Sequence, residues 1–96
     1  MSSNKSTRKP KTRFNRSTAR RVGNHLHINW KKIPFEEFYM GINVELEHGL
    51  INPHTNVTDD DPVLTGKIAL AHLNENCRYY TYLKHMEELM DSIYPC

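Results

Sequence analysis

Hydrophobic and polar positions follow the helical period through most of the chain after residue 33. In residues 34–48, large apolar side chains recur every three or four positions, at Phe35, Phe38, Ile42 and Leu46. This spacing places them on one face of an α-helix. The pattern therefore predicts an amphipathic helix over residues 34–48.

A second helix is predicted over residues 62–75. Asp61 is a good N-cap residue, and Pro62 suits the first helical turn because its missing N–H needs no partner there. Apolar residues cover much of the circumference of this helix, which predicts a central position. The small residues Gly66, Ala69 and Ala71 would let a neighbouring helix approach closely.

A third helix is predicted over residues 78–93, where apolar residues form one stripe. The stripe consists of Tyr79, Leu83, Met86, Met90 and Ile93. At this spacing we expect Tyr79 to lie in the core and the neighbouring tyrosines to be partly exposed. Before residue 34 the pattern predicts only a short helix over 18–26 and an extended stretch around Trp30. We therefore expect an all-α fold, a small bundle of three main helices.

The charges are divided unevenly between the two ends of the chain. The first 35 residues contain ten basic and no acidic residues, whereas the remaining 61 contain three basic and eleven acidic residues. Apolar residues before Val22 are few, so this segment would not bury enough surface to offset the entropy of ordering. We therefore predict a basic, extended, flexible N-terminal arm over 1–23 and a helical domain over 24–96.

The predicted arm has the composition of a partner-binding segment. A chain with this many cations would neutralise several phosphates in a non-specific, salt-dependent way, or lie along an acidic protein surface. A solubilising tail is the alternative. The candidate binding residues are Arg8, Lys9, Lys11, Arg13, Arg16, Arg20 and Arg21.

The hydropathy of the chain and its two cysteines indicate in which cellular compartment the protein lies. No apolar run is long enough to cross a membrane, and the basic N-terminus lacks the apolar segment of a secretory signal. Cys77 and Cys96 are far apart in the sequence, which favours free thiols. We therefore expect an intracellular protein in a reducing compartment, with no membrane contact.

Two Glu/His pairs have the spacing of helical metal ligands. Glu45 and His48 are three residues apart, as are His72 and Glu75, so each pair shares a helix face. Carboxylate-bridged metal sites in helical bundles use such pairs. The alternative is that Glu45 and Glu47 are solvated, that His48 favours a helix C-terminus and that His72 is a hydrogen-bonded core residue. We expect no cofactor, and a divalent metal at these four residues is the alternative.

Three quoted segments together resemble a known family. The segments are "FEEFYMGINVELEHG", "NVTDDDPVLTGKIALAHLNE" and "YYTYLKHME", over about residues 34–88. They resemble a small uncharacterised helical domain of bacteria, phages and large DNA viruses, which is classed as a domain of unknown function. The resemblance implies a compact helical domain and a soluble protein, and its occurrence in viral genomes implies a viral origin. Members typically have Pro-Asp before the double tyrosine, where this chain has Cys77 and Arg78.

These observations favour an interaction protein over an enzyme. The sequence has no glycine-rich phosphate loop, and no motif marks Cys77 as a nucleophile. We expect a non-enzymatic interaction or assembly protein, such as a virion component, whose arm contacts nucleic acid or an acidic protein surface. The alternative is a metal-binding helical protein, a hydrolase or an oxidoreductase, that uses the Glu/His ligands.

Overall fold

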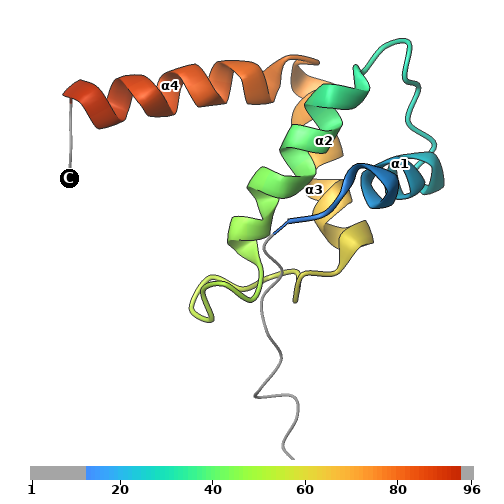
Figure 1. The fold of residues 1–96 in the computed structure, drawn as a ribbon, viewed down its shortest axis with the longest axis horizontal. Helices are drawn as coiled ribbons and strands as arrows, with labels where there is room; N and C mark the ends of the chain where they lie inside the picture. Colours follow the sequence, from blue (N-terminus) through green and yellow to red (C-terminus); the bar gives the residue numbers. More distant parts are fainter. Residues whose placement is uncertain (1–12, 94–96) are drawn as a thin grey trace, which may run out of the picture.

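A computed structural model describes residues 13–93 of the chain, and in this part every regular element is helical (Figure 1). The elements are α1 (Arg16–His25), α2 (Phe35–Val44), the 3-10 helix η2 (Glu45–His48), α3 (Pro62–Glu75) and α4 (Tyr79–Ile93). The all-α prediction is confirmed. The prediction of three main helices is wrong, because residues 16–25 form a fourth α-helix that belongs to the folded body.

The core lies where α1, α2 and α3 meet. Each of these helices contacts the other two, and Phe38, Ile42 and Ala69 have no exposed surface. Gly66 lets α1 approach α3 closely, since a Cβ atom at this position would lie 2.6 Å from Cγ1 of Val22. The predicted role of small residues in α3 is therefore confirmed for Gly66, and Ala69 is buried, whereas Ala71 is exposed and the prediction is wrong for it.

Helix α1 is an integral part of this core rather than part of a flexible arm. Phe14, Ala19 and Val22 are all buried. The segment is fixed by Asn43 of α2, whose Oδ1 accepts from the Phe14 N–H at 2.6 Å and whose Nδ2 donates to the Phe14 carbonyl at 3.1 Å. The arm boundary predicted at residue 23 is therefore at least ten residues too late. Residues 1–12, including Arg8, Lys9 and Lys11, lie outside the described part.

Helix α4 leaves the body of the domain and extends away from it (Figure 1). Its first turn is held by the buried carboxylate of Glu37 in α2, which accepts from the N–H groups of Tyr80 and Thr81 at 3.1 and 3.4 Å and from the Thr81 hydroxyl. Every residue from 84 to 93 is exposed. Tyr80, rather than the predicted Tyr79, is the buried tyrosine.

The segment between η2 and α3 folds back onto the end of η2. The carbonyl of His48 accepts from the Val57 N–H at 2.6 Å, and Oδ1 of the buried Asp60 accepts from the Leu50 N–H at 2.9 Å. Gly49 has φ −112°, and the positive φ values of this segment occur at Asp59 and Asp60. These contacts hold His48 beside the body of the domain.

Candidate functional site

A buried carboxylate, that of Glu45, is the centre of the polar cluster at the junction of η2, α3 and α4. Only 3% of Glu45 is exposed. Its Oε2 accepts a hydrogen bond from the Tyr80 hydroxyl at 2.6 Å. Burial, and then this hydrogen bond to the carboxylate, raises the pKa of Tyr80 far above its ordinary value. The hydroxyl therefore remains protonated at neutral pH and keeps donating to Glu45.

The two histidines of the predicted metal site approach Glu45 through different oxygens. Nε2 of His48 lies 3.5 Å from Oε1, and Nε2 of His72 lies 3.7 Å from Oε2. The ring of His72 stacks on that of Tyr79, with 4.3 Å between centroids and 12° between planes. The structure thus brings Glu45, His48 and His72 together, although they come from separate parts of the sequence.

Glu75, the fourth predicted ligand, lies further out. Its Oε1 is 3.8 Å from Nδ1 of His72, and the Glu75 side chain is exposed. Glu47, a possible ligand by its residue type but outside the four favoured residues, lies close to His48, because its Oε2 is 3.3 Å from Nε2 of His48. Side chains three residues apart eclipse on a 3-10 helix, so the turn of Glu45–His48 places His48 over Glu45, and the exposed Glu47 side chain reaches His48 from the neighbouring position.

The sequence analysis also missed Tyr80 as a member of the cluster. The double tyrosine was visible, but the direction in which α4 leaves α3 decides which of the two rings turns inward. Gly41 makes room for it, since a Cβ at this position would lie 2.3 Å from Cε2 of Tyr80. A glycine on the buried face of a predicted helix is the sequence signal for such a close approach.

Three of the predicted arm residues lie on the surface of the body. Arg16 pairs with Glu36 through two hydrogen bonds, one of them 2.9 Å long between Nη1 and Oε1. This pairing lowers the pKa of Glu36 and raises that of Arg16. Arg20 lies 4.0 Å from the centroid of the Phe35 ring, and Arg13 lies 5.3 Å from that of Tyr39.

These contacts hold Arg13, Arg16 and Arg20 beside α2, which supplies Phe35, Glu36 and Tyr39. Arg21 is also exposed. Arg16, Arg20 and Arg21 are held by the folded helix α1 and Arg13 lies just before it, so these residues differ from the extended chain that the sequence predicted.

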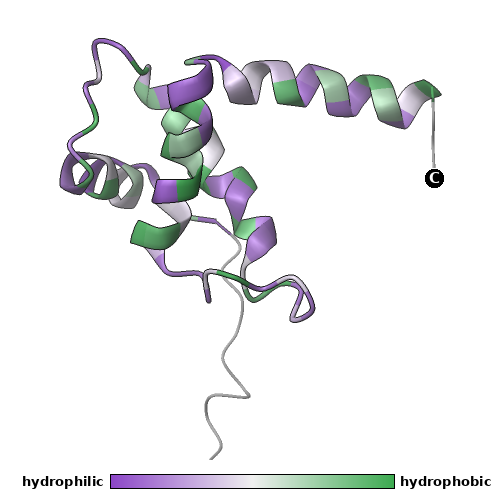
Figure 2. Cartoon of the chain, turned by 180° about the vertical axis from the view of Figure 1, so that it is seen from behind, coloured by the Kyte–Doolittle hydropathy of each residue, from purple (hydrophilic) through white to green (hydrophobic). Residues whose placement is uncertain are grey.

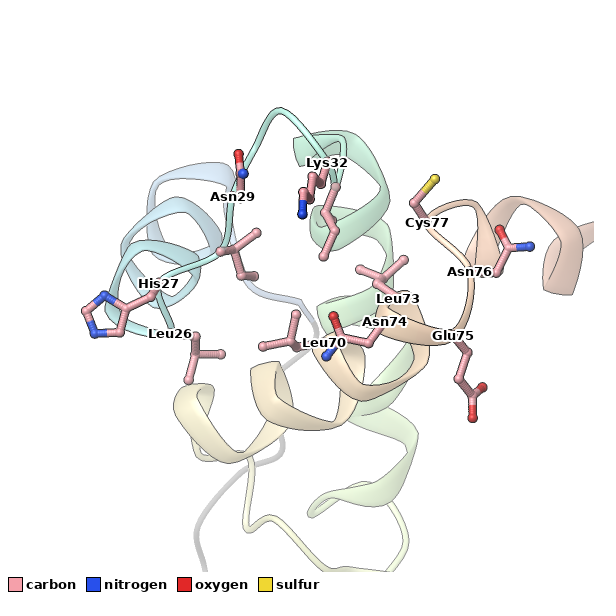
Figure 3. Close-up of a pocket in the computed structure, with 12 residues that line it drawn as sticks. Leu26, His27, Asn29, Lys32, Leu70, Leu73, Asn74, Glu75, Asn76 and Cys77 are labelled. Carbon is pink, nitrogen blue, oxygen red and sulfur yellow. The ribbon is translucent and has the colours of Figure 1, made fainter.

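A hollow of about 400 Å³ lies between the turn after α1 and the end of α3 (Figure 3). Its lining includes Leu26, Leu70 and Leu73, with Asn29 and Cys77 among the residues around them. The Cys77 thiol is free and exposed.

Several large apolar side chains are exposed along α4, and the surface that they form is here called the α4 face. Hydrophobic and hydrophilic residues alternate along this helix (Figure 2). The side chains of the α4 face are 45 to 57% exposed. They are Tyr82, Met86, Leu89, Met90 and Ile93.

Comparison with known families identifies the domain. A family model described as "Protein of unknown function (DUF5661)" matches residues 19–89. The chain belongs to this family. The match confirms the resemblance to an uncharacterised domain family, and it begins inside α1, earlier than the segments quoted above. Searches of curated proteins and of solved structures found no significant match. Among the described residues, no helix combines the length and the hydrophobicity needed to cross a membrane.

Proposed function

We propose that this DUF5661 domain is a non-enzymatic assembly module that pairs with a second copy of itself through the α4 face. The observation that supports the proposal is the exposed apolar stripe on a helix whose residues 84–93 are all exposed. Isolated helices of this length are marginal in water, and most helices in proteins depend on packing of their apolar face. A partner helix would supply that packing.

The spacing of the stripe suits another helix. Tyr82, Met86, Leu89 and Ile93 alternate by four and three residues, the repeat that forms the seam between paired helices. Fully burying such a side chain contributes about 1.5–3 kcal/mol, so two copies with ten half-exposed side chains would gain roughly 8–15 kcal/mol. Association costs about 4–15 kcal/mol, which is of the same size as this gain, so we expect a weak and reversible dimer.

The charges on α4 favour an antiparallel pair. Arg78 and Lys84 lie toward its start, whereas Glu87, Glu88 and Asp91 lie toward its end. Acidic residues near a helix C-terminus are unfavourable because of the helix dipole. In an antiparallel pair, the basic start of the partner helix would lie beside them, and the two bodies would be at opposite ends.

The basic residues would give the assembled protein a second contact. Arg8, Lys9 and Lys11 remain candidate contacts to nucleic acid or to an acidic protein surface, and Arg21 extends this positive region onto the body. In the concrete version of the proposal, the protein is a virion component that joins copies of itself to nucleic acid.

Sedimentation analysis of the full chain, from about 1 µM to several hundred µM, tests the pairing. We expect reversible dimerisation that Leu89→Glu abolishes. Val57→Glu is the matched control, because Val57 is 73% exposed in the loop outside α4, and this variant should dimerise normally. A wild-type chain that is monomeric throughout this range would refute the pairing.

A separate measurement tests the basic contact. The variant in which Arg8, Lys9 and Lys11 are all replaced by glutamine should bind duplex DNA more weakly, with a shallower dependence of affinity on salt. An unchanged affinity and salt slope would exclude a nucleic-acid role for these residues.

A further inference from the structure

We infer that Glu45, Glu47 and His48 form a binding site for a first-row divalent metal ion of the Zn²⁺ type. This inference goes beyond the proposed pairing, since the three residues lie on η2 and not on the α4 face. Their ligand atoms, Oε1 of Glu45, Oε2 of Glu47 and Nε2 of His48, all lie within 4.8 Å of one another.

The distances are close to those of a tetrahedral site. Ligand bonds of about 2.0–2.1 Å place neighbouring ligand atoms of a tetrahedron roughly 3.3 Å apart. Nε2 of His48 is already 3.5 Å from Oε1 of Glu45 and 3.3 Å from Oε2 of Glu47. The remaining adjustment falls to the Glu47 side chain, which is 61% exposed and free to rotate.

The charges of the cluster favour a cation. Glu45 is a buried carboxylate, and a buried charge requires a compensating partner. The Tyr80 hydroxyl satisfies Oε2, whereas the nearest ionisable group recorded at Oε1 is the His48 imidazole. Among the described residues no lysine or arginine forms an ion pair with Glu45, Glu47 or Glu75, so a metal dication is well suited to this position.

The donor atoms select the class of metal. Ca²⁺ and Mg²⁺ bind through oxygen ligands, whereas imidazole nitrogen combined with carboxylates suits Zn²⁺ and its first-row neighbours. With three protein ligands, a fourth position remains for water or for a ligand from outside. His48 and Glu47 are both partly exposed, which gives the ion access from solvent.

His72 has a smaller part in this site than its sequence spacing suggested. It approaches Oε2 of Glu45, on the side occupied by Tyr80, and its Nδ1 faces Glu75. The ligand set therefore changes from the two predicted Glu/His pairs to Glu45, Glu47 and His48. Replacing His72 should weaken metal binding less than replacing His48.

Titration calorimetry with ZnCl₂ on the tag-free, metal-stripped full chain tests the site. We expect one Zn²⁺ per chain, and His48→Ala and Glu47→Gln should each weaken binding at least about tenfold. Glu47→Gln changes an exposed side chain and should not impair folding. His54→Ala and Cys77→Ser, at exposed positions outside the cluster, are the controls and should leave the affinity unchanged.

Thermal unfolding supplies a second readout. Zn²⁺ at about 100 times its dissociation constant should raise the Tm of the wild type by roughly 10 °C or more, and Mg²⁺ or Ca²⁺ should not. The inference is overturned if the wild type does not bind Zn²⁺. It is also overturned if His48→Ala and Glu47→Gln bind Zn²⁺ as tightly as the wild type, or if His54→Ala weakens Zn²⁺ binding instead.

Discussion

The hydrogen bond from Tyr80 to Glu45 connects α4 to the polar cluster, and Tyr80→Phe removes it while retaining the ring. The bond is 2.6 Å long, and 1% of Tyr80 and 3% of Glu45 are exposed. A hydrogen bond to a charged group contributes about 1.5–3 kcal/mol, and the variant leaves a buried carboxylate without this donor. We therefore expect the free energy of unfolding to fall by about 2–3 kcal/mol.

Urea denaturation followed by circular dichroism, in the presence of a chelator, measures this loss. The midpoint should fall with no change in the m-value, and the Tm should fall by roughly 8–20 °C. Tyr82→Phe is the matched control, because it removes the same hydroxyl from a 57% exposed ring on the same helix and should change stability by less than about 0.5 kcal/mol. Equal effects of the two substitutions would refute the argument.

The direction of the Tyr80 pKa shift adds a pH dependence. The pKa of the folded protein is raised above the ordinary value of 10.0, so above pH 10 the unfolded chain releases the Tyr80 proton while the folded chain retains it. The contribution of Tyr80 to stability is therefore complete below pH 10 and declines above it. The wild type should lose more stability than Tyr80→Phe between pH 9 and pH 11, measured by the urea midpoint.

Three other substitutions test the packing and the charges of the body. Gly41→Ala should destabilise the fold in thermal unfolding, because its Cβ would meet the buried Tyr80 ring, and overpacking of about 1–3 kcal/mol outweighs the gain in helix propensity of roughly 1 kcal/mol. Glu37→Gln should cost about 1–2 kcal/mol and accelerate amide exchange in the first turn of α4, since the N–H groups there lose a charged acceptor. Glu36→Gln should reduce the fall in Tm on acidification, because Arg16 lowers the pKa of Glu36 in the folded protein below 4.5. The stability that this ion pair contributes disappears as the pH falls through the lowered pKa. An equal fall in Tm in the wild type and the variant would contradict this reasoning.

Local signals were sufficient to locate most of the helices. The helix predicted over 62–75 has these bounds in the structure, and Asp61 caps it by accepting from the Leu64 N–H at 2.9 Å. The helix predicted over 34–48 is α2 continued by η2, and the last helix begins one residue later than predicted. Caps and apolar spacing act within a few residues, so they can be interpreted without knowledge of the fold.

The position of α1 could not be predicted in this way. Its apolar residues Phe14, Ala19 and Val22 are too sparse for a strong periodic signal, and ten basic residues surround or follow them before residue 36. Their burial depends on a surface that exists only after α2 and α3 have packed together. Asn43, 29 residues away in sequence, completes the attachment through its two hydrogen bonds to Phe14.

The sequence by itself determined the all-α class, the three later helices and the kind of chemistry available to Glu45, His48 and His72. Only the tertiary structure decided that both histidines approach one buried carboxylate, that Tyr80 turns inward and that α4 leaves its apolar stripe exposed. The helical period specifies which residues share a face. What that face contacts depends on loop geometry and on close approaches such as that at Gly41, which join residues distant in sequence.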